Sequence, residues 1–231
     1  MLIDRQGTLH RIVSPERIRA RGTAMTAEDP LSQPGLDPKL LDELTRFEGL
    51  LTDLGALVVQ ALRPGLGREE FDAIVDRVCP DVPAEVRTWF AWHDGSNDDF
   101  ADEGDAYVPN GLPLLSLADA IAESRHMTRT SGPDGSFDPE PGSTWSPTWL
   151  PLQQLNWWWI VADAAGGEDA PAPIHAVSLH VPRPWSEPYL PSITAMVRIW
   201  NRHLEAGEHN WDAQGRRWAN RVSDPDYPLI M

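Results

Sequence analysis

Six carboxylates within twelve positions are the side chains of this sequence most able to do chemistry. They follow His93 with no basic residue among them: Asp94, Asp98, Asp99, Asp102, Glu103 and Asp105. Dense carboxylates can hold a cation, but the calcium-binding EF-hand loop does not fit. Aligning Gly104 as its sixth residue puts Ala101 at the third position and Asn110 at the twelfth. His93 also lacks a second histidine four residues away, which is the spacing of helical zinc sites.

Two other interpretations of this acidic run stay open beside a metal site. A run of like charges is ordinarily a solvated surface. It can also be a negatively charged docking surface for a basic protein, and the formal net charge of −16 favours that use.

Other catalytic and ligand-binding patterns are missing from the sequence. The single cysteine, Cys79, excludes an internal disulfide framework and a cysteine-based zinc site. The histidines outside the acidic run show no paired ligand spacing, and there is no nucleophile elbow, Walker loop or dinucleotide-binding fingerprint. We therefore expect a protein that is not an enzyme and that binds no cofactor and no metal.

Three consecutive tryptophans, Trp157, Trp158 and Trp159, form the other conspicuous pattern. On a strand, the first and third would share one face and the second would lie on the other. One face should be core, and the opposite face is either covered by a helix or exposed as a recognition patch that anchors a partner. We favour burial on both sides, because helices usually cover the sheets of α+β domains.

The overall charge narrows the classes of partner. The 231 residues include 35 acidic and 19 basic side chains, and the first 24 residues carry a net +3, which leaves −19 on the remainder. We expect no binding to nucleic acid, because such binding depends on Lys and Arg neutralising phosphates. We also expect no membrane association, since no apolar run approaches the roughly 18 residues that span a bilayer. The N-terminus has no secretory signal pattern, which predicts a cytoplasmic protein.

Three segments of different character divide the chain. Residues 1–35 form an N-terminal arm, which we expect to be disordered or to include an over-extended gene start ahead of Met25. Residues 36–207 carry regular apolar periodicity and form the expected domain. Residues 208–231 form a C-terminal extension, for which we expect one short helix and a loose end.

Within residues 36–207, helices come first and strands come late. Apolar spacings of three and four predict helices that begin near Pro38, Glu69, Pro83, Leu117 and Ile193, and the third should run to Gly95. The expected N-caps are Asp37, Ser116 (in a capping box with Asp119) and Ser192. Strands are expected at residues 149–152, 157–163 and 174–180. The fold class is therefore α+β, with a mainly antiparallel sheet of about 4–6 strands and helices packed around it in a single domain.

The order of motifs along this domain is informative. The motifs are Pro83-Ala-Glu-Val-Arg-Thr-Trp89-Phe90-Ala-Trp92-His93-Asp94-Gly95, Leu112-Pro-Leu-Leu-Ser116, Trp149-Leu-Pro-Leu152, Trp157-Trp-Trp-Ile-Val-Ala-Asp163 and Ile174-His-Ala-Val177. Followed by a closing helix, this order resembles the SUKH superfamily, which includes the fungal cell-wall assembly regulators and many bacterial proteins. The likeness covers about Asp37 to Gly207, and it implies an α+β domain without a shared catalytic apparatus.

Among bacterial members, the resemblance implies immunity proteins that bind and neutralise toxin domains, often nucleases. We therefore expect a non-catalytic protein-binding domain that neutralises a basic toxin domain. An acidic inhibitor suits a nuclease, because its carboxylates can occupy the phosphate positions of a basic groove. The expected contacts are the six carboxylates of the acidic run, with the three tryptophans as apolar anchors.

Two functions from other classes remain as alternatives. The first is a regulatory scaffold in cell-wall or stress signalling, and the second is a metal-dependent hydrolase that uses the acidic run. The sequence does not indicate an oligomeric state.

Overall fold

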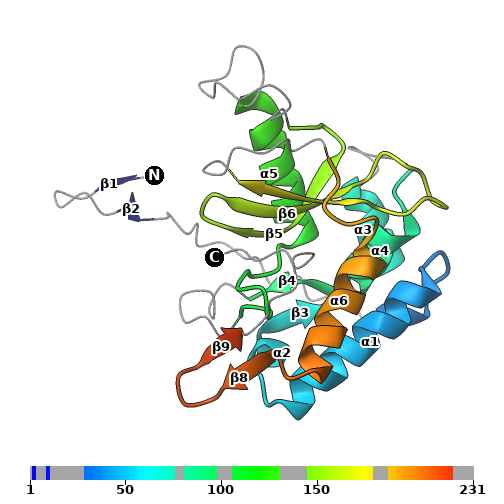
Figure 1. The fold of residues 1–231 in the computed structure, drawn as a ribbon. Coiled ribbons are helices and arrows are strands. Elements are labelled where there is room, and N and C mark those ends of the chain that lie inside the picture. Colours follow the sequence, from blue (N-terminus) through cyan, green and yellow to red (C-terminus); the bar gives the residue numbers. More distant parts are fainter. Residues whose placement is uncertain are drawn as a thin grey trace, which may run out of the picture.

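Helices and antiparallel strand pairs make up the part of the chain described by the computed structural model, which comprises residues 2–3, 9–10, 29–75, 81–97, 106–130, 145–178 and 187–220 (Figure 1). The helices are η1 (Pro30–Ser32), α1 (Pro38–Asp53), α2 (Val58–Ala61), α3 (Arg68–Val75), α4 (Ala84–Trp92), α5 (Leu117–Thr130) and α6 (Ile193–Glu205). The strands are β1 (Leu2–Ile3), β2 (Leu9–His10), β3 (Leu62–Pro64), β4 (His93–Ser96), β5 (Trp149–Leu155), β6 (Trp158–Asp163), β7 (Ile174–Ser178), β8 (His209–Asp212) and β9 (Arg217–Asn220). The α+β class expected from the sequence is confirmed.

The strands form small antiparallel sheets. β5, β6 and β7 pair in that order, while β3–β4, β8–β9 and β1–β2 form separate pairs. A single sheet of four to six strands is not confirmed. Residues 113–115 connect β4 to β5 only through isolated contacts: the Ser96 amide donates to the Leu114 carbonyl (2.9 Å), and the Leu115 amide donates to the Leu152 carbonyl (2.9 Å). Pro113 has no amide hydrogen, which keeps this stretch from extending into a longer strand.

Both faces of the three-stranded sheet are covered. One face contributes alternate β-strand side chains, including Leu152, Ile160 and Ile174, to the main core shared with α1, α4 and α6. The opposite face contributes Trp149, Trp159, Val161 and Val177 to a smaller cluster with Met127 of α5. The alternation along β6 therefore follows the two-residue period of a strand, with each face buried against different elements.

Local sequence determines where α1 begins and which side it buries. The Asp37 carboxylate accepts a hydrogen bond from the Leu40 amide (2.8 Å), and Pro38 occupies the first turn, where no amide hydrogen is needed. The apolar stripe Leu40, Leu44 and Phe47 is fully buried. The N-cap expected from the sequence is confirmed.

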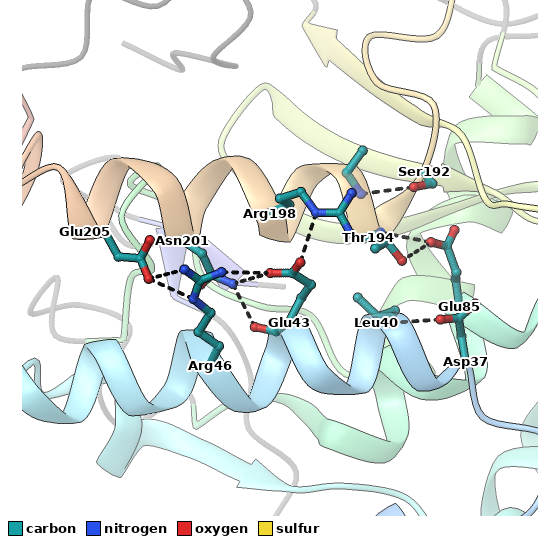
Figure 2. Close-up of polar contacts among 11 residues, drawn as sticks. Asp37, Leu40, Glu43, Arg46, Glu85, Ser192, Thr194, Arg198, Asn201 and Glu205 are labelled. Carbon is teal, nitrogen blue, oxygen red and sulfur yellow. Dashed lines mark hydrogen bonds and ion pairs between the residues drawn. The ribbon is translucent and has the colours of Figure 1, made fainter.

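Helix α6 lies beside α1 and packs on it through apolar and charged contacts (Figures 1 and 2). Ser192 caps α6 by accepting from the Ala195 amide (3.0 Å), and the buried Trp200 ring lies 5.2 Å from the Phe47 ring. Aromatic side chains bury more surface area each than other residue types, so they contribute strongly to the stability of a helix contact. Phe47 and Trp200 therefore form the centre of the contact between α1 and α6.

A charged network closes the solvent side of the α1–α6 contact, as Figure 2 shows. Glu43 accepts hydrogen bonds from the Arg198 guanidinium (2.9 Å) and from the side-chain amide of Asn201 (2.9 Å), and Arg46 forms an ion pair with Glu205. Burial opposes ionisation of Glu43, but the hydrogen bonds from Arg198 and Asn201, with the charges of Arg198 and Arg46, together lower the pKa of Glu43 below its usual 4.5. The network therefore favours the ionised carboxylate.

Glu85 of α4 is a buried carboxylate that joins three segments. It is 4% exposed and accepts hydrogen bonds from the backbone amides of Ala172 (2.8 Å), Ile193 (3.3 Å) and Thr194 (2.9 Å). The Thr194 hydroxyl donates to the same carboxylate (Figure 2). Two of these amides belong to the first turn of α6, whose exposed N–H groups and dipole favour a negative charge.

Two expectations about element limits are corrected. The third helix was expected to reach Gly95, but α4 ends at Trp92 and His93 begins β4. Gly95 has a φ of 79° and turns the chain where a β-carbon would lie 2.5 Å from the Ser116 amide nitrogen. The backbone of residues 115–116 approaches too closely for a continuing helix.

The second correction concerns the chain after Gly207. A short helix was expected there, but residues 209–220 form the β8–β9 hairpin. Trp211 joins the main core, and the Trp218 indole N–H donates to the Tyr107 carbonyl (2.7 Å). The packed unit therefore extends beyond residue 207. Within the expected N-terminal arm, the structure describes residues 29–35, which include η1, and the short strands β1 and β2. The prediction of disorder or of an over-extended gene start otherwise concerns residues outside the described part.

Replacing Glu85 by alanine should lower the free energy of unfolding by about 2–4 kcal/mol, because the buried donors of Ala172 and Thr194 lose their acceptor. Urea denaturation of wild type and E85A measures the difference. The conservative E85Q variant keeps one acceptor oxygen and should lie between them. D169N, which neutralises an exposed carboxylate, is the control. An unchanged midpoint for E85A would contradict this structural role.

The lowered pKa of Glu43 makes its contribution to stability depend on pH. The stabilisation is present above the unfolded-state pKa near 4.5 and is lost as the pH falls through the lower folded-state pKa. We expect E43Q to be less stable than wild type by about 1 kcal/mol at neutral pH, and we expect this gap to close in acid. Denaturant unfolding across the acid range tests this, and a gap that is constant with pH would refute it.

Candidate protein-binding site

The acidic run lies mostly outside the described residues. Asp98, Asp99, Asp102, Glu103 and Asp105 are among the residues that the structure does not describe, so their expected role as partner contacts stays a prediction. Asp94 is described, and it has a local structural role. Its carboxylate accepts a hydrogen bond from the Leu117 amide (2.8 Å) in the first turn of α5.

Asp94 and Ser116 together cap helix α5. The Ser116 hydroxyl accepts from the Asp119 amide (3.1 Å), as the capping box in the sequence predicts, and donates to the Asp119 carboxylate (2.6 Å). Burial raises the pKa of Asp94 above its usual 3.8; the Leu117 hydrogen bond and the charge of Arg63 oppose this rise, and the charge of Asp119 adds to it. Asp94 is thus a half-buried cap rather than an open contact.

His93, the other described member of this region, is also engaged. Its Nδ1 lies 2.7 Å from the Arg63 carbonyl, and its Nε2 lies 3.5 Å from Glu48, which accepts the Trp92 indole N–H (2.9 Å). Within the described ranges, no group of three or more His, Cys, Asp or Glu side chains is arranged to hold a metal ion.

The three tryptophans differ sharply in exposure. Trp157 is 54% exposed, Trp158 is half-buried, and Trp159 is 3% exposed. Burial on both faces is therefore found for β6 from Trp159 onward, whereas Trp157 lies before the strand begins. The Trp159 indole N–H donates to Glu123 of α5 (3.1 Å), so Trp159 is held inside the fold and is not presented to a partner.

The turn between β5 and β6 explains why Trp157 is outside. Leu155 pairs with Trp158, which leaves Asn156 and Trp157 as a two-residue hairpin loop. Asn156 has a φ of 53°, a left-handed conformation that asparagine tolerates better than most residues. The loop places the Trp157 side chain at the tip of the hairpin and not on either sheet face.

A groove of about 310 Å³ lies between this hairpin and α5. Its lining comes from β3, from the end of β4, from residues 113–115, from one side of α5 and from β5: Arg63, Ser96, Asn97, Pro113, Leu114, Leu115, Asp119, Ala122, Glu123 and Gln154. Asn97, at one edge, directly precedes the undescribed part of the acidic run. In the sequence, the lining residues Asn97 and Gln154 thus come one residue before Asp98 and three residues before Trp157.

The charges of the groove are unevenly balanced. Among the described residues that line it, Arg63 is the one cation, and the Arg63 guanidinium lies 4.0 Å from the Asp119 carboxylate. Glu123 supplies a second carboxylate on the same side of α5. Two carboxylates against one guanidinium leave the groove negative, which favours a cationic ligand group.

A second, more open pocket of about 610 Å³ lies where the first residues of α1, α4 and α6 meet. Helix N-termini attract anions, but the chain supplies its own carboxylates there. Glu85 takes the α6 amides and Asp37 takes an α1 amide. We therefore assign this pocket a structural origin and place the candidate site at the groove lined by Arg63, Asp119, Glu123 and Gln154.

Most of the residues that line the groove were not predicted as site residues from the sequence. Arg63, Glu123 and Gln154 come from separate elements and carry no motif, so no signal in the sequence brings them together. The i, i+4 spacing of Asp119 and Glu123 on an expected helix could have indicated that they share a face.

No protein-family model matches the sequence, and no curated protein matches it either. In the part of the chain that the structure describes, no helix has the length and apolar character that crossing a membrane requires.

The raised pKa of Asp94 predicts an unusual effect of pH. Its favourable contribution is complete below the unfolded-state pKa near 3.8 and is lost as the pH rises through the higher folded-state pKa. We expect D94N, which keeps an acceptor for Leu117 but has no charge, to gain stability relative to wild type as the pH rises to neutral. Denaturant unfolding from acid to neutral pH measures this.

The control for this experiment is D94A, which also lacks the charge but removes the acceptor, and it should be about 1 kcal/mol less stable than D94N at every pH. If D94N and wild type keep the same difference in unfolding free energy across the range, Asp94 is not a buried ionisable cap.

Proposed function

We propose that this chain is a non-catalytic protein-binding domain of the immunity type, which neutralises a basic toxin domain, for example a nuclease. The observation that carries the proposal is a negatively charged groove in a chain of net charge −16, together with an exposed tryptophan, Trp157, in the hairpin that supplies Gln154 to the groove. Aromatic side chains at the centre of an interface provide most of its binding energy, and complementary charge accelerates association.

The resemblance to the SUKH superfamily supports the same proposal. Its motifs fall on α4, β4, the stretch before α5, and the three-stranded sheet, and of these β4, the stretch before α5 and β5 contribute residues to the groove lining. We infer a SUKH-like domain in which Leu114 connects the strand pairs into one sheet. We also infer a cytoplasmic location, where the partner protein is synthesised as well. The partner class is a protein, with neither nucleic acid nor membrane as the ligand.

The experiment begins with the protein that co-purifies from the source cell and with the genes beside this one. The proposal expects a basic toxin domain, and it expects that co-expression with this chain restores growth of a host that the toxin alone arrests. If the partner is not toxic, the immunity function is wrong and a regulatory scaffold is favoured instead.

Neutralising the acidic run should weaken this complex. We expect D98N/D99N/D102N/E103Q to bind at least about tenfold more weakly at low salt, mainly through slower association, because steering by the run is lost. Surface plasmon resonance at increasing salt measures both rates. The matched control D42N/D53N/D169N/E168Q removes the same charges from exposed positions elsewhere. Binding that is insensitive to salt and equal in both variants would refute electrostatic docking.

A further inference from the structure

The β5–β6 hairpin carries both an exposed aromatic ring, Trp157, and a polar residue of the groove lining, Gln154. Within the described residues, Trp157 is the large hydrophobic side chain that stands exposed, at 54%. Gln154, three positions earlier in the same hairpin, lines the groove, and its side-chain amide donates to the Asn156 carbonyl (2.9 Å) at the turn. The Trp157 indole at the hairpin tip and the groove-lining Gln154 are thus held by the same turn.

The opposite wall of the groove is an acidic side of α5. Asp119 and Glu123 are four residues apart on α5 and therefore project from the same side of the helix. Glu123 is fixed by the indole N–H of Trp159 (3.1 Å), and Asp119 is fixed by the Ser116 hydroxyl (2.6 Å). Because both carboxylates are already oriented by neutral donors, a cationic ligand would meet acceptors that need little reordering.

The cation that lines the groove does not neutralise both carboxylates. Arg63 lies 4.0 Å from Asp119, and its charge also acts on Asp94, which lowers the pKa of Asp94 against the larger effect of burial. Glu123 has no ion pair among the described residues; its hydrogen bond comes from the neutral Trp159 indole. Glu123 is therefore the carboxylate with which an incoming cation would gain most.

We propose that the groove receives an arginine side chain of the protein partner, with its guanidinium on Glu123 and Asp119. Trp157 packs against apolar side chains of the partner next to this arginine. The planar guanidinium forms paired hydrogen bonds with a carboxylate and packs on aromatic rings, which the compact lysine ammonium does less well. The volume of about 310 Å³ suits a single long side chain, since it lies at the low end for ligand pockets. This inference rests on the proposed protein-binding function, and it identifies where the partner docks.

The first test needs no partner. The tripeptide acetyl-Gly-Arg-Gly-amide is titrated into the ¹⁵N-labelled full chain, and the indole N–H of Trp159 and the side-chain amide of Gln154 are followed by NMR. We expect saturable shifts of both signals, weaker shifts with the lysine peptide and none with the glutamate peptide. E123Q should weaken arginine-peptide binding at least about fivefold, since the charge is removed while the acceptor for Trp159 is kept.

The matched control is D53N, which removes one exposed charge at the end of α1, outside the groove lining. D53N should bind the arginine peptide as wild type does. W157A, which also lies outside the groove lining, should bind this short peptide as wild type does and should weaken only the complex with the protein partner. Shifts that do not saturate, or equal binding by E123Q and wild type, would overturn the proposal.

The second test uses the purified complex with the toxin domain. Each arginine of the partner that becomes protected on binding is replaced by alanine, and one of these variants should be non-additive with E123Q by at least about fivefold in Kd. A partner that binds E123Q and W157A with wild-type affinity would overturn the groove assignment while leaving the immunity function intact. A chain that binds the arginine peptide but protects against no toxin would overturn the immunity function instead.

Discussion

The buried carboxylate of Glu85 is the interaction on which the arrangement of the helices depends. It lies at the start of α4 and accepts from the amides that begin α6 and from Ala172, in the connection that follows β6. A carboxylate in the interior is stable only when its oxygens are satisfied, and here the donors are three backbone amides and the Thr194 hydroxyl. The start of α6 is therefore fixed against α4, and Trp200 is positioned between Phe47 and Trp89.

This constraint divides the molecule into two sides with different properties. On one side, α1, α4 and α6 enclose the large aromatic core, and their charged residues are consumed by contacts such as those of Glu43 with Arg198 and Asn201. On the other side, α5 and the β5–β6 hairpin meet at a groove, and Trp157 stands in solvent. The first side uses its polar groups to stabilise the fold, whereas the second side leaves the Trp157 ring exposed and lines a groove with carboxylates.

The net charge of −16 gains a different meaning from this division. Glu85, Glu43 and Asp94 are counted among the acidic residues, but each accepts hydrogen bonds that hold helices in place. Asp119 and Glu123 line the groove instead. A formal charge therefore overstates the negative surface that a partner would meet, and the position of each carboxylate decides its role.

The sequence by itself determined the local elements: the caps at Asp37, Ser116 and Ser192, the apolar stripes of α1 and α6, and the strands near Trp149, Trp159 and Ile174. These depend on interactions within a few residues, which spacing and residue type report directly. Tertiary structure alone decided that α4 stops before His93, that residues 209–220 form a hairpin, and that Arg63, Glu123 and Gln154 line one groove. The same holds for Trp157, which differs from Trp159 only by its place in a turn. The end of α4 and the groove lining depend on contacts between residues far apart in the chain, and the two hairpins depend on the register in which neighbouring strands pair, which residue type and spacing alone do not specify.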